Sequence, residues 1–465
     1  MLLGIQENFQ LFLTNMADVI KLKKGLDLRL EGVAQQEFGQ ASQGEFIGFN
    51  PSDFYGIVPK PALKPGDAVK VGTVLFYNKK QPDVKIVSPV SGTLEAINRG
   101  DKRKILSIVV KNDFKGTQEK LEKINLNGSA EDIKKALSDA GMLAFIKQRP
   151  YDVIANPADT PKSIFISAFD VAPLAPDYDF IFKDSQSDFQ NGVDVLAKIA
   201  PVFVGVKNGT KSFAHIKNAT VTAFEGKYPA SNVGVHINHV DPINKGEIVW
   251  TIGAQEVVYI GRYASKGVLD FSKNVALTGS EASARMYFKM ILGQQLGQVL
   301  DGNICKGSNA TVISGNPLSG VEASASDFLA PFVNQITVMK NGSDTHELLG
   351  WIMPRFKQFS SYNSVCSTFL SKICPKFKFD YDTRLLGGKR NMIMSGEYDK
   401  VLPMDIYGEF LIKAIIAFDI DKMEELGIYE VAPEDFAAAE CVCSSKMELQ
   451  RIVREGLDKL QKEMC

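Results

Sequence analysis

Between Val19 and Val110 the sequence consists of short runs of Val, Ile, Leu and Phe that Gly, Pro and Asp interrupt. Examples are "ALKPGDAVKVGTVLFY" and "RKILSIVVKND". Pro65 to Asp67 (Pro-Gly-Asp) and Asn98 to Gly100 (Asn-Arg-Gly) are turn sequences between these runs. Closely spaced strands with such turns favour a small sandwich or barrel over a βαβ unit.

The stretch Tyr77 to Gly100, "YNKKQPDVKIVSPVSGTLEAINRG", has the hairpin pattern of proteins that carry biotin or lipoate on a lysine. A carrier lysine stands at the apex of a tight, symmetric turn, usually as Asp-Lys or Met-Lys. Here the tip reads "NKKQPD", Pro82 stiffens it, and Lys80 lies farther from the Ser-Pro pair than the carrier pattern requires. The pattern predicts a barrel-sandwich shape and favours an unmodified scaffold hairpin over a modified Lys80.

From about Asn125 the pattern changes to alternating helices and strands. "SAEDIKKALSDAGMLAFI" has an N-cap candidate at Ser129 and apolar residues near one face, which predicts a helix. "SIFISAF", "NGVDVLAKIA", "PVFVGVKNG" and "ATVTAFEG" continue an α/β domain that ends near Arg262. In the short module that follows, we expect "NVALTGS" and "ATVISGNPLSG" as strands and "MYFKMILGQQLGQVLDG" as a helix. The last hundred or so residues are mostly helical and close with "KMELQRIVREGLDKLQKEM".

Composition excludes several classes of protein. A chain of 465 residues has room for about three or four domains. Its net charge of −1 argues against nucleic acid as the main partner. No stretch reaches the roughly 18 apolar residues of a membrane-spanning helix, and the opening residues lack the basic start of a secretory signal. The scattered cysteines suggest neither a disulfide framework nor an iron–sulfur cluster.

Short catalytic motifs are scarce. "HINHVD" (His236, His239, Asp241) has the residue types of a metal site. On an extended segment the two histidines would point to opposite faces, which favours hydrogen-bonded loop histidines over a metal site. Neither G-x-G-x-x-G nor the Gly-Lys-Ser/Thr phosphate loop is present. We therefore predict no catalytic residue and no metal ligand on this chain alone.

Longer motifs carry a family resemblance. The first of these motifs begins at Met16 and reads "MADVIKLKKGLDLRLEG". The others include "KSIFISAFDVAPLAPD", "GVHINHVDPINKGEIVWTIGAQEVVYIGR" and "PMDIYGEFLIKAIIAFDIDKMEELG". By these motifs the chain closely resembles the NqrA family, the A subunits of the Na⁺-translocating NADH:quinone oxidoreductase, a bacterial respiratory sodium pump. The resemblance runs to the C-terminus and leaves Met1 to Asn15 outside, which supports Met16 as the start.

The resemblance implies a peripheral subunit on the cytoplasmic face of the bacterial inner membrane. Such a subunit binds the other five subunits of the complex and reaches the membrane only through them. NADH, flavins, iron centres and quinone are then used through other subunits, with no cofactor on this chain. A part in the quinone-reduction step has been assigned to this subunit, so quinone is a candidate ligand. The alternatives from the residues alone are a biotin- or lipoate-type carrier and a free-standing flavin NADH dehydrogenase.

The resemblance also gives a multidomain α+β fold class. We predict a disordered leader or a start assigned too early at residues 1–15, and a barrel-sandwich hybrid domain at 16–124. A Rossmann-like α/β domain at 125–262, an SLBB-like β-grasp module at 263–326 and a mixed to helical C-terminal domain at 327–465 complete the chain.

Comparison with two relatives points to a candidate contact region. The C subunit of the Rnf complex and the NADH-binding flavoprotein of respiratory complex I have a Gly-Gly-Ala-Gly loop that cradles flavin phosphate, where this chain has "DAGMLAFIKQRP". Its bulky side chains argue against flavin binding. "SAFDVAP" also lacks one carboxylate of the Rnf motif, and "CVCSSK" has too few thiolates for an iron–sulfur cluster. We predict that the aromatic and basic residues of the altered loop contact quinone or a partner: Phe145, Lys147, Arg149 and Tyr151.

Overall fold

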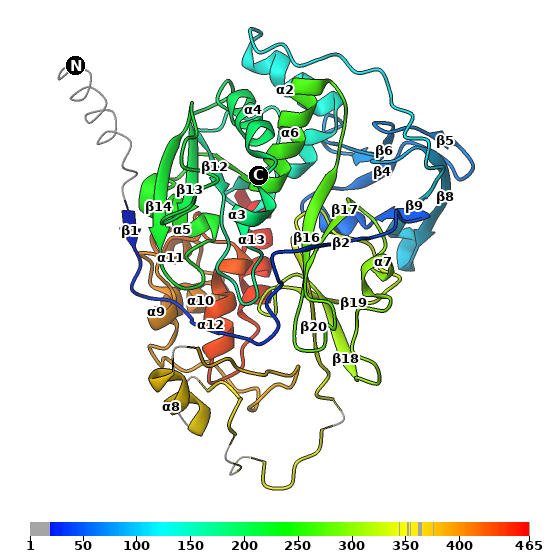
Figure 1. Ribbon diagram of the computed structural model, residues 1–465. Coiled ribbons are helices and arrows are strands. Elements are labelled where there is room, and N and C mark those ends of the chain that lie inside the picture. The colour runs from blue at the N-terminus through cyan, green and yellow to red at the C-terminus, as the bar shows by residue number, and fades with distance from the viewer. Residues whose placement is uncertain are drawn as a thin grey trace, which may run out of the picture.

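The computed structural model describes residues 19–343, 345–350, 353, 355–360, 365–374 and 376–464. The predicted leader at 1–15 and the start at Met16 lie outside these residues. Figure 1 shows the blue, strand-rich N-terminal part on one side of the molecule and a green parallel sheet on the other. The orange and red C-terminal helices pack beside the green sheet.

Two small antiparallel sheets form the N-terminal β module, as the short strand runs predict. Their strand orders are β3-β9-β8-β5 and β4-β6-β7. Ile47, Leu75 and Val110 are fully buried in their core, and the predicted hairpin forms where β6 pairs with β7. The elements are β3 (Phe46–Phe49), η1 (Pro51–Asp53), β4 (Pro59–Pro61), β5 (Ala68–Val69), β6 (Val74–Asn78), β7 (Lys85–Val87), β8 (Gly92–Arg99), η2 (Asp101–Arg103) and β9 (Ile105–Asn112).

A seven-stranded sheet of order β1-β14-β13-β12-β15-β10-β11 forms the α/β part. β12 pairs in parallel with β13 on one side and with β15 on the other, so the chain winds outward from β12 in both directions. β10 and β11 extend the β15 edge in antiparallel fashion. The strands are β1 (Val19–Lys21), β10 (Lys147–Arg149), β11 (Val153–Ile154), β12 (Ser163–Ser167), β13 (Val202–Lys207), β14 (Thr220–Glu225) and β15 (Val249–Gly253).

Side-chain caps mark the starts of two helices of this part, α2 and α3. Ser129 caps the first of them by accepting a hydrogen bond from the Asp132 amide, and Asp132 accepts one from the Ser129 amide in return, which confirms the predicted helix start. The helices are α2 (Ala130–Asp139), η3 (Met142–Phe145), α3 (Tyr178–Ile181), α4 (Gln186–Leu196), α5 (Val233–Val240) and α6 (Ala254–Lys266).

A six-stranded sheet of order β19-β18-β20-β16-β17-β2 follows. The helix predicted for "MYFKMILGQQLGQVLDG" is wrong: its first half is strand β17, and only α7 is helical. β17 pairs with β16, Val275 opposite Phe288, and Gly293 (φ +75°) turns the chain after it, so sheet pairing overrides the helix-like apolar run. The elements are β2 (Phe38–Gly39), β16 (Ser272–Thr278), β17 (Tyr287–Ile291), α7 (Gly297–Leu300), β18 (Ala310–Ser314), β19 (Val321–Ala323) and β20 (Gln335–Lys340).

The C-terminal part is helical, as predicted. The last helix, α13, buries Val453, Leu457 and Leu460 in one core with Val235 and Ile237 of α5, so its apolar side is a packing face. Among the described residues, no helix has the length and apolar composition to cross a bilayer. The elements are α8 (Cys366–Ile373), α9 (Tyr398–Val401), α10 (Gly408–Ala417), α11 (Ile420–Glu425), η4 (Pro433–Phe436), α12 (Ala437–Val442) and α13 (Leu449–Met464).

Candidate functional site

A crevice lies at the carboxyl ends of β12 and β15, where the winding of the parallel sheet reverses. Its volume is about 600 Å³, and Ser167, Asp170 and Gly253 form part of its wall. Ligands of open α/β sheets bind at such reversal points, because the loops that leave neighbouring strands there diverge and open a space. The crevice is therefore the first candidate functional site.

The four residues predicted to contact quinone or a partner lie around this crevice but not on one exposed surface. Phe145 and Lys147 line it. Arg149 is completely buried behind it, and Phe145 is only 4% exposed. Tyr151, also largely buried, lines a neighbouring cavity instead. Lys147 and Tyr151 are thus the two that a ligand could reach directly, while the contact role of all four stays a prediction.

The Arg149 guanidinium links β10 to the C-terminal part. Its Nη1 donates to the Glu430 carbonyl oxygen at 3.2 Å and lies 3.8 Å from the Asp435 carboxylate. Its Nε lies 3.8 Å from Asp152, and its Nη2 lies 4.0 Å from Glu434. Neither Nε nor Nη2 has a hydrogen-bond partner among the described residues. One buried cation therefore lies among three carboxylates, with imperfect hydrogen bonding.

The carboxylates around Arg149 have pKa values shifted in different directions. Burial would raise the pKa of Asp152, but Lys147, Arg149 and a further arginine hold it below its usual range. Burial raises the pKa of Glu434 to about 7, with Lys147 opposing this. The pKa of Asp435 is also raised by burial, against the opposing charge of Arg149. Of these three carboxylates, Glu434 also lines the crevice directly.

A second cavity of about 1220 Å³ adjoins the crevice at Ser52 and Tyr55, which line both. The β module, the α/β sheet and α13 meet around it. The Tyr55 hydroxyl donates to Asp458 at 2.5 Å, and the Arg454 guanidinium lies 4.1 Å from the centre of the Tyr55 ring. Arg454 also donates to the Tyr151 carbonyl oxygen at 2.6 Å.

Sequence reasoning missed several residues of these two cavities. Tyr55, Glu434 and Arg454 come from segments far apart in the chain, and no local motif marks any of them. Asp170 is different, because it lies in the "SAFDVAP" stretch that the sequence comparison singled out. Its carboxylate accepts from the Ala172 amide at 2.8 Å and from the Ser231 hydroxyl at 3.2 Å, and burial raises its pKa.

The residues of the altered loop do not fit a flavin phosphate. Met142, Leu143 and Ala144 are at most 1% exposed and form the short helix η3. Gly141, with φ +70°, follows the carboxyl end of α2, so the helix end nearest this loop presents carbonyl groups. Phosphate sites need free amides at a helix amino end. The buried side chains of η3 leave no space for such a group here.

The histidine motif lies on helix α5, not on the extended segment that the sequence suggested. The His236 ring stacks on Phe224 and Phe169, and its Nε2 contacts the Ala230 carbonyl oxygen at 3.0 Å. Burial lowers the pKa of His236 to about 3, so the ring is neutral. His239 contacts the Val235 carbonyl oxygen. Both histidines are hydrogen-bonded, and the described ranges contain no cluster of His, Cys, Asp and Glu suited to a metal ion.

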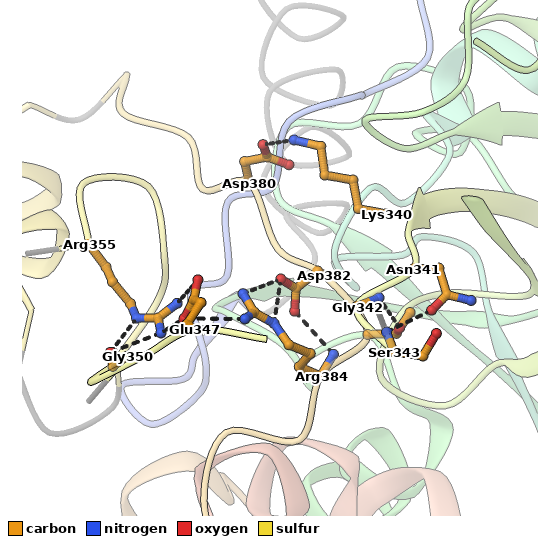
Figure 2. Close-up of polar contacts among 11 residues, drawn as sticks. Lys340, Asn341, Gly342, Ser343, Glu347, Gly350, Arg355, Asp380, Asp382 and Arg384 are labelled. Atoms are coloured by element: carbon orange, nitrogen blue, oxygen red, sulfur yellow. Dashed lines mark hydrogen bonds and ion pairs between the residues drawn. The ribbon is translucent and has the colours of Figure 1, made fainter. Parts of the chain in front are cut away.

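A third group of polar side chains lies beyond β20 (Figure 2). Lys340 pairs with Asp380 at 2.5 Å, and Arg384 pairs with Asp382 at 2.6 Å and with Glu347 at 3.3 Å. Arg355 also contacts Glu347, and Figure 2 shows these side chains pointing toward one another. Because each of these cations has an acidic partner, the group ties neighbouring loops together.

These features define a mixed α/β protein with a β-sandwich module, an α/β sheet and a charged crevice beside the C-terminal helices. Three family models match it: the NqrA N-terminal barrel-sandwich hybrid domain at residues 20–113, the NqrA second alpha/beta domain at 128–269 and the NQRA C-terminal domain at 274–325.

Curated relatives match nearly the whole chain. The A subunit of the Na(+)-translocating NADH-quinone reductase of Haemophilus influenzae (strain 86-028NP) is 34% identical over 453 residues, which are 96% of this chain and 100% of the relative. The corresponding proteins of Pasteurella multocida (strain Pm70) and Hahella chejuensis (strain KCTC 2396) are 33% and 35% identical, with the same coverage. The chain therefore belongs to the NqrA family, the A subunits of the Na(+)-translocating NADH-quinone reductase, which confirms the resemblance seen in its motifs.

One solved structure, an NAD+-reducing [NiFe]-hydrogenase in the H2-reduced state, is similar over 39% of this chain and 41% of its own, with a TM-score of 0.31 and 11% identity.

Proposed function

We propose that this chain is a peripheral subunit of a Na⁺-pumping NADH:quinone oxidoreductase, which reduces quinone with electrons from NADH and exports Na⁺ from the cytoplasm. The observation that carries the proposal is the full-length match to relatives named as the A subunit of that reductase, at 33–35% identity. In this proposal the chain lies at the cytoplasmic face of the bacterial inner membrane and binds the other five subunits.

Within the complex the chain has a docking and shaping role and holds no redox cofactor itself. The filled loop at η3 supports this role, because buried Met142 and Leu143 occupy the place where a flavin phosphate would need free amides. NADH, flavins, iron centres and quinone are then handled through other subunits. We further assign the α/β part as Rossmann-like, on its β14-β13-β12-β15 strand order, and the 263–326 module as an SLBB-like β-grasp fold.

The contact with quinone or with a partner involves the region around Phe145, Lys147, Arg149 and Tyr151. Lys147 reaches the crevice with a charged end, and Tyr151 presents a ring to the larger cavity. Phe145 and Arg149 act behind them by holding β10 in place. Lys147→Gln combined with Tyr151→Leu should weaken quinone affinity or assembly of the complex, whereas Lys183→Gln, at an exposed position outside both cavities, should change neither.

Affinity capture tests the complex. The tagged chain is isolated from membranes in a mild detergent and assayed for Na⁺-stimulated NADH:quinone activity and for flavin-containing partners. Co-purification of both is expected. If the chain is captured alone, under conditions that keep another membrane complex of the same cells intact, the assembly is a different one.

The two alternative functions make different predictions for the purified chain. A biotin- or lipoate-type carrier would have a mass above the value calculated from the sequence, because its lysine is modified. A free-standing flavin NADH dehydrogenase would release flavin on denaturation. The proposal of a docking role in the reductase expects an unmodified, colourless protein.

A further inference from the structure

Basic side chains gather at one end of the β module, around the hairpin that resembles a carrier hairpin. A pocket of about 560 Å³ lies there, between the start of β4, the tip of the β6–β7 hairpin and the β8–β9 turn. Its cations are Lys60, Lys79, Arg99, Arg103 and Lys104, and the described residues that line it include no carboxylate. The whole chain has a net charge of −1, so this concentration of positive charge is local.

The cations of this pocket are exposed side chains with no acidic partner in the part of the chain that the structure describes. All five are solvent-exposed, and within the described residues none forms an ion pair with an acidic side chain. Lys60 lies over the Tyr77 ring, with its Nζ 5.5 Å from the ring centre. Like charges held around one concave pocket repel each other, and an anion bound between them removes that repulsion.

The backbone holds part of this arrangement in an unfavourable conformation. Lys102 and Arg103 have φ values of 52° and 60°, a region that residues with a side chain seldom adopt. The turn is closed by the Gly100 amide, which donates to the Lys104 carbonyl oxygen at 2.9 Å. Arg99 also donates to the Arg103 carbonyl oxygen at 3.1 Å. Strained backbone of this kind gathers at functional sites, where the surrounding structure maintains it.

The basic pocket borders the 1220 Å³ cavity, because Pro59, Lys104 and Ile105 line both. Aromatic and apolar side chains line much of that cavity, among them Tyr429 and Ile57. A cationic pocket beside an apolar one matches a ligand with two parts, a phosphate group and an apolar or aromatic body.

We propose that the basic pocket binds the phosphate of a phosphate-bearing amphiphile, whose apolar or aromatic body enters the adjoining cavity. Lys79 and Lys104 contact the phosphate from the two turns. The carrier-like hairpin then provides a charged binding edge and not a modified lysine. The ligand is either a soluble nucleoside phosphate or the headgroup of an anionic phospholipid, since both present the same phosphate chemistry.

The test uses the purified full-length chain, so it does not depend on assembly of the reductase. Binding of ADP and of inorganic pyrophosphate is measured by calorimetry at low salt. Cosedimentation is measured with phosphatidylcholine vesicles that contain or lack phosphatidylglycerol. The test variant is Lys79→Gln with Lys104→Gln. The control is Lys183→Gln with Lys198→Gln, which removes two exposed lysines outside both cavities.

Loss of two charge-assisted contacts should weaken binding at least about tenfold in the test variant and leave it unchanged in the control. Saturable binding of ADP or pyrophosphate with that pattern identifies a soluble ligand. Binding only to vesicles that contain phosphatidylglycerol, with the same pattern, identifies a lipid headgroup. Absence of binding in both assays, or equal loss in both variants, overturns the proposal. Circular dichroism must show that both variants remain folded.

Discussion

Replacing Arg149 with methionine tests whether the buried charge cluster holds the C-terminal part on the α/β sheet. Among the described residues, Arg149 is the only cation that forms an ion pair with Asp435, at 3.8 Å, and the substitution removes it. Asp435 has no solvent exposure. Breaking a buried ion pair by removing one partner costs about 3–5 kcal/mol. Nε and Nη2 of Arg149 lack hydrogen-bond partners among the described residues, and losing such buried donors recovers on the order of 1 kcal/mol. The expected loss of unfolding free energy is therefore about 2–4 kcal/mol.

Urea unfolding followed by far-UV circular dichroism at pH 7 measures this loss. The matched control is Arg451→Met, because the Arg451 side chain is 59% exposed and pairs with Glu448 and Glu455 on the surface of α13. Such a surface pair contributes little to stability, because water screens its charges. If Arg149→Met is no more destabilising than the control, the buried cluster does not hold the two parts together and the reasoning fails.

A double-mutant cycle identifies the source of the loss. Asp435→Asn keeps the shape of the side chain and removes its charge, so Arg149→Met should be less damaging in that background than in the native chain. The coupling should exceed about 1 kcal/mol, because the two groups are in contact and fully buried. Additive effects would show that the pair with Asp435 does not account for the cost of Arg149→Met.

Three single sites give further predictions. Burial raises the pKa of Asp53 to about 6, so between about pH 4 and pH 6 the folded protein binds a proton that the unfolded chain releases. The free energy of unfolding therefore falls as the pH rises through this range. Asp53→Asn should remove up to about 2 kcal/mol of this fall, and an unchanged pH profile would contradict the prediction. The intact mass should equal that of the unmodified chain, and any added mass that peptide mapping places on Lys80 would refute this. A Cβ on Gly261 would lie 1.6 Å from the Asp188 carbonyl oxygen. Gly261→Ala should therefore force α4 and α6 apart and lower the free energy of unfolding by about 1–3 kcal/mol. Gly388 has open space around it, so Gly388→Ala should leave thermal unfolding nearly unchanged.

Local sequence patterns predicted those parts of the fold that local interactions decide. The capping pair at Ser129 and Asp132 marks the start of α2 because both hydrogen bonds close within four residues. The hairpin after β6 and the amphipathic helix α13 follow from turn residues and apolar periodicity in the same way. Strand β17 was missed because Tyr287 to Ile291 is an apolar run that suits either structure, and its pairing with β16 decides the outcome.

The site was less predictable because its contacts join distant segments. The loop around Phe145 and Lys147 could be found, since it departs from a recognisable motif. The burial of Arg149 could not, because its partners Glu430 and Asp435 lie about 280 residues farther along the chain. The same holds for β1, which pairs in parallel with β14 instead of joining the N-terminal β module.

The charges that surround Arg149 also have a consequence for how β10 and η4 are placed relative to each other. If only a filled cavity were needed, apolar side chains of similar volume would serve at least as well, since buried ion pairs seldom add stability over such a replacement. Charged groups constrain the relative orientation of the two elements more than apolar groups would. Arg149 can face Asp152, Glu434 and Asp435 together only when β10 and η4 have one relative placement. The ion-pair cluster around Arg149 thus favours one placement of η4 against β10. In the docking role proposed for this chain, one fixed placement of its parts would hold their contact surfaces in a constant arrangement.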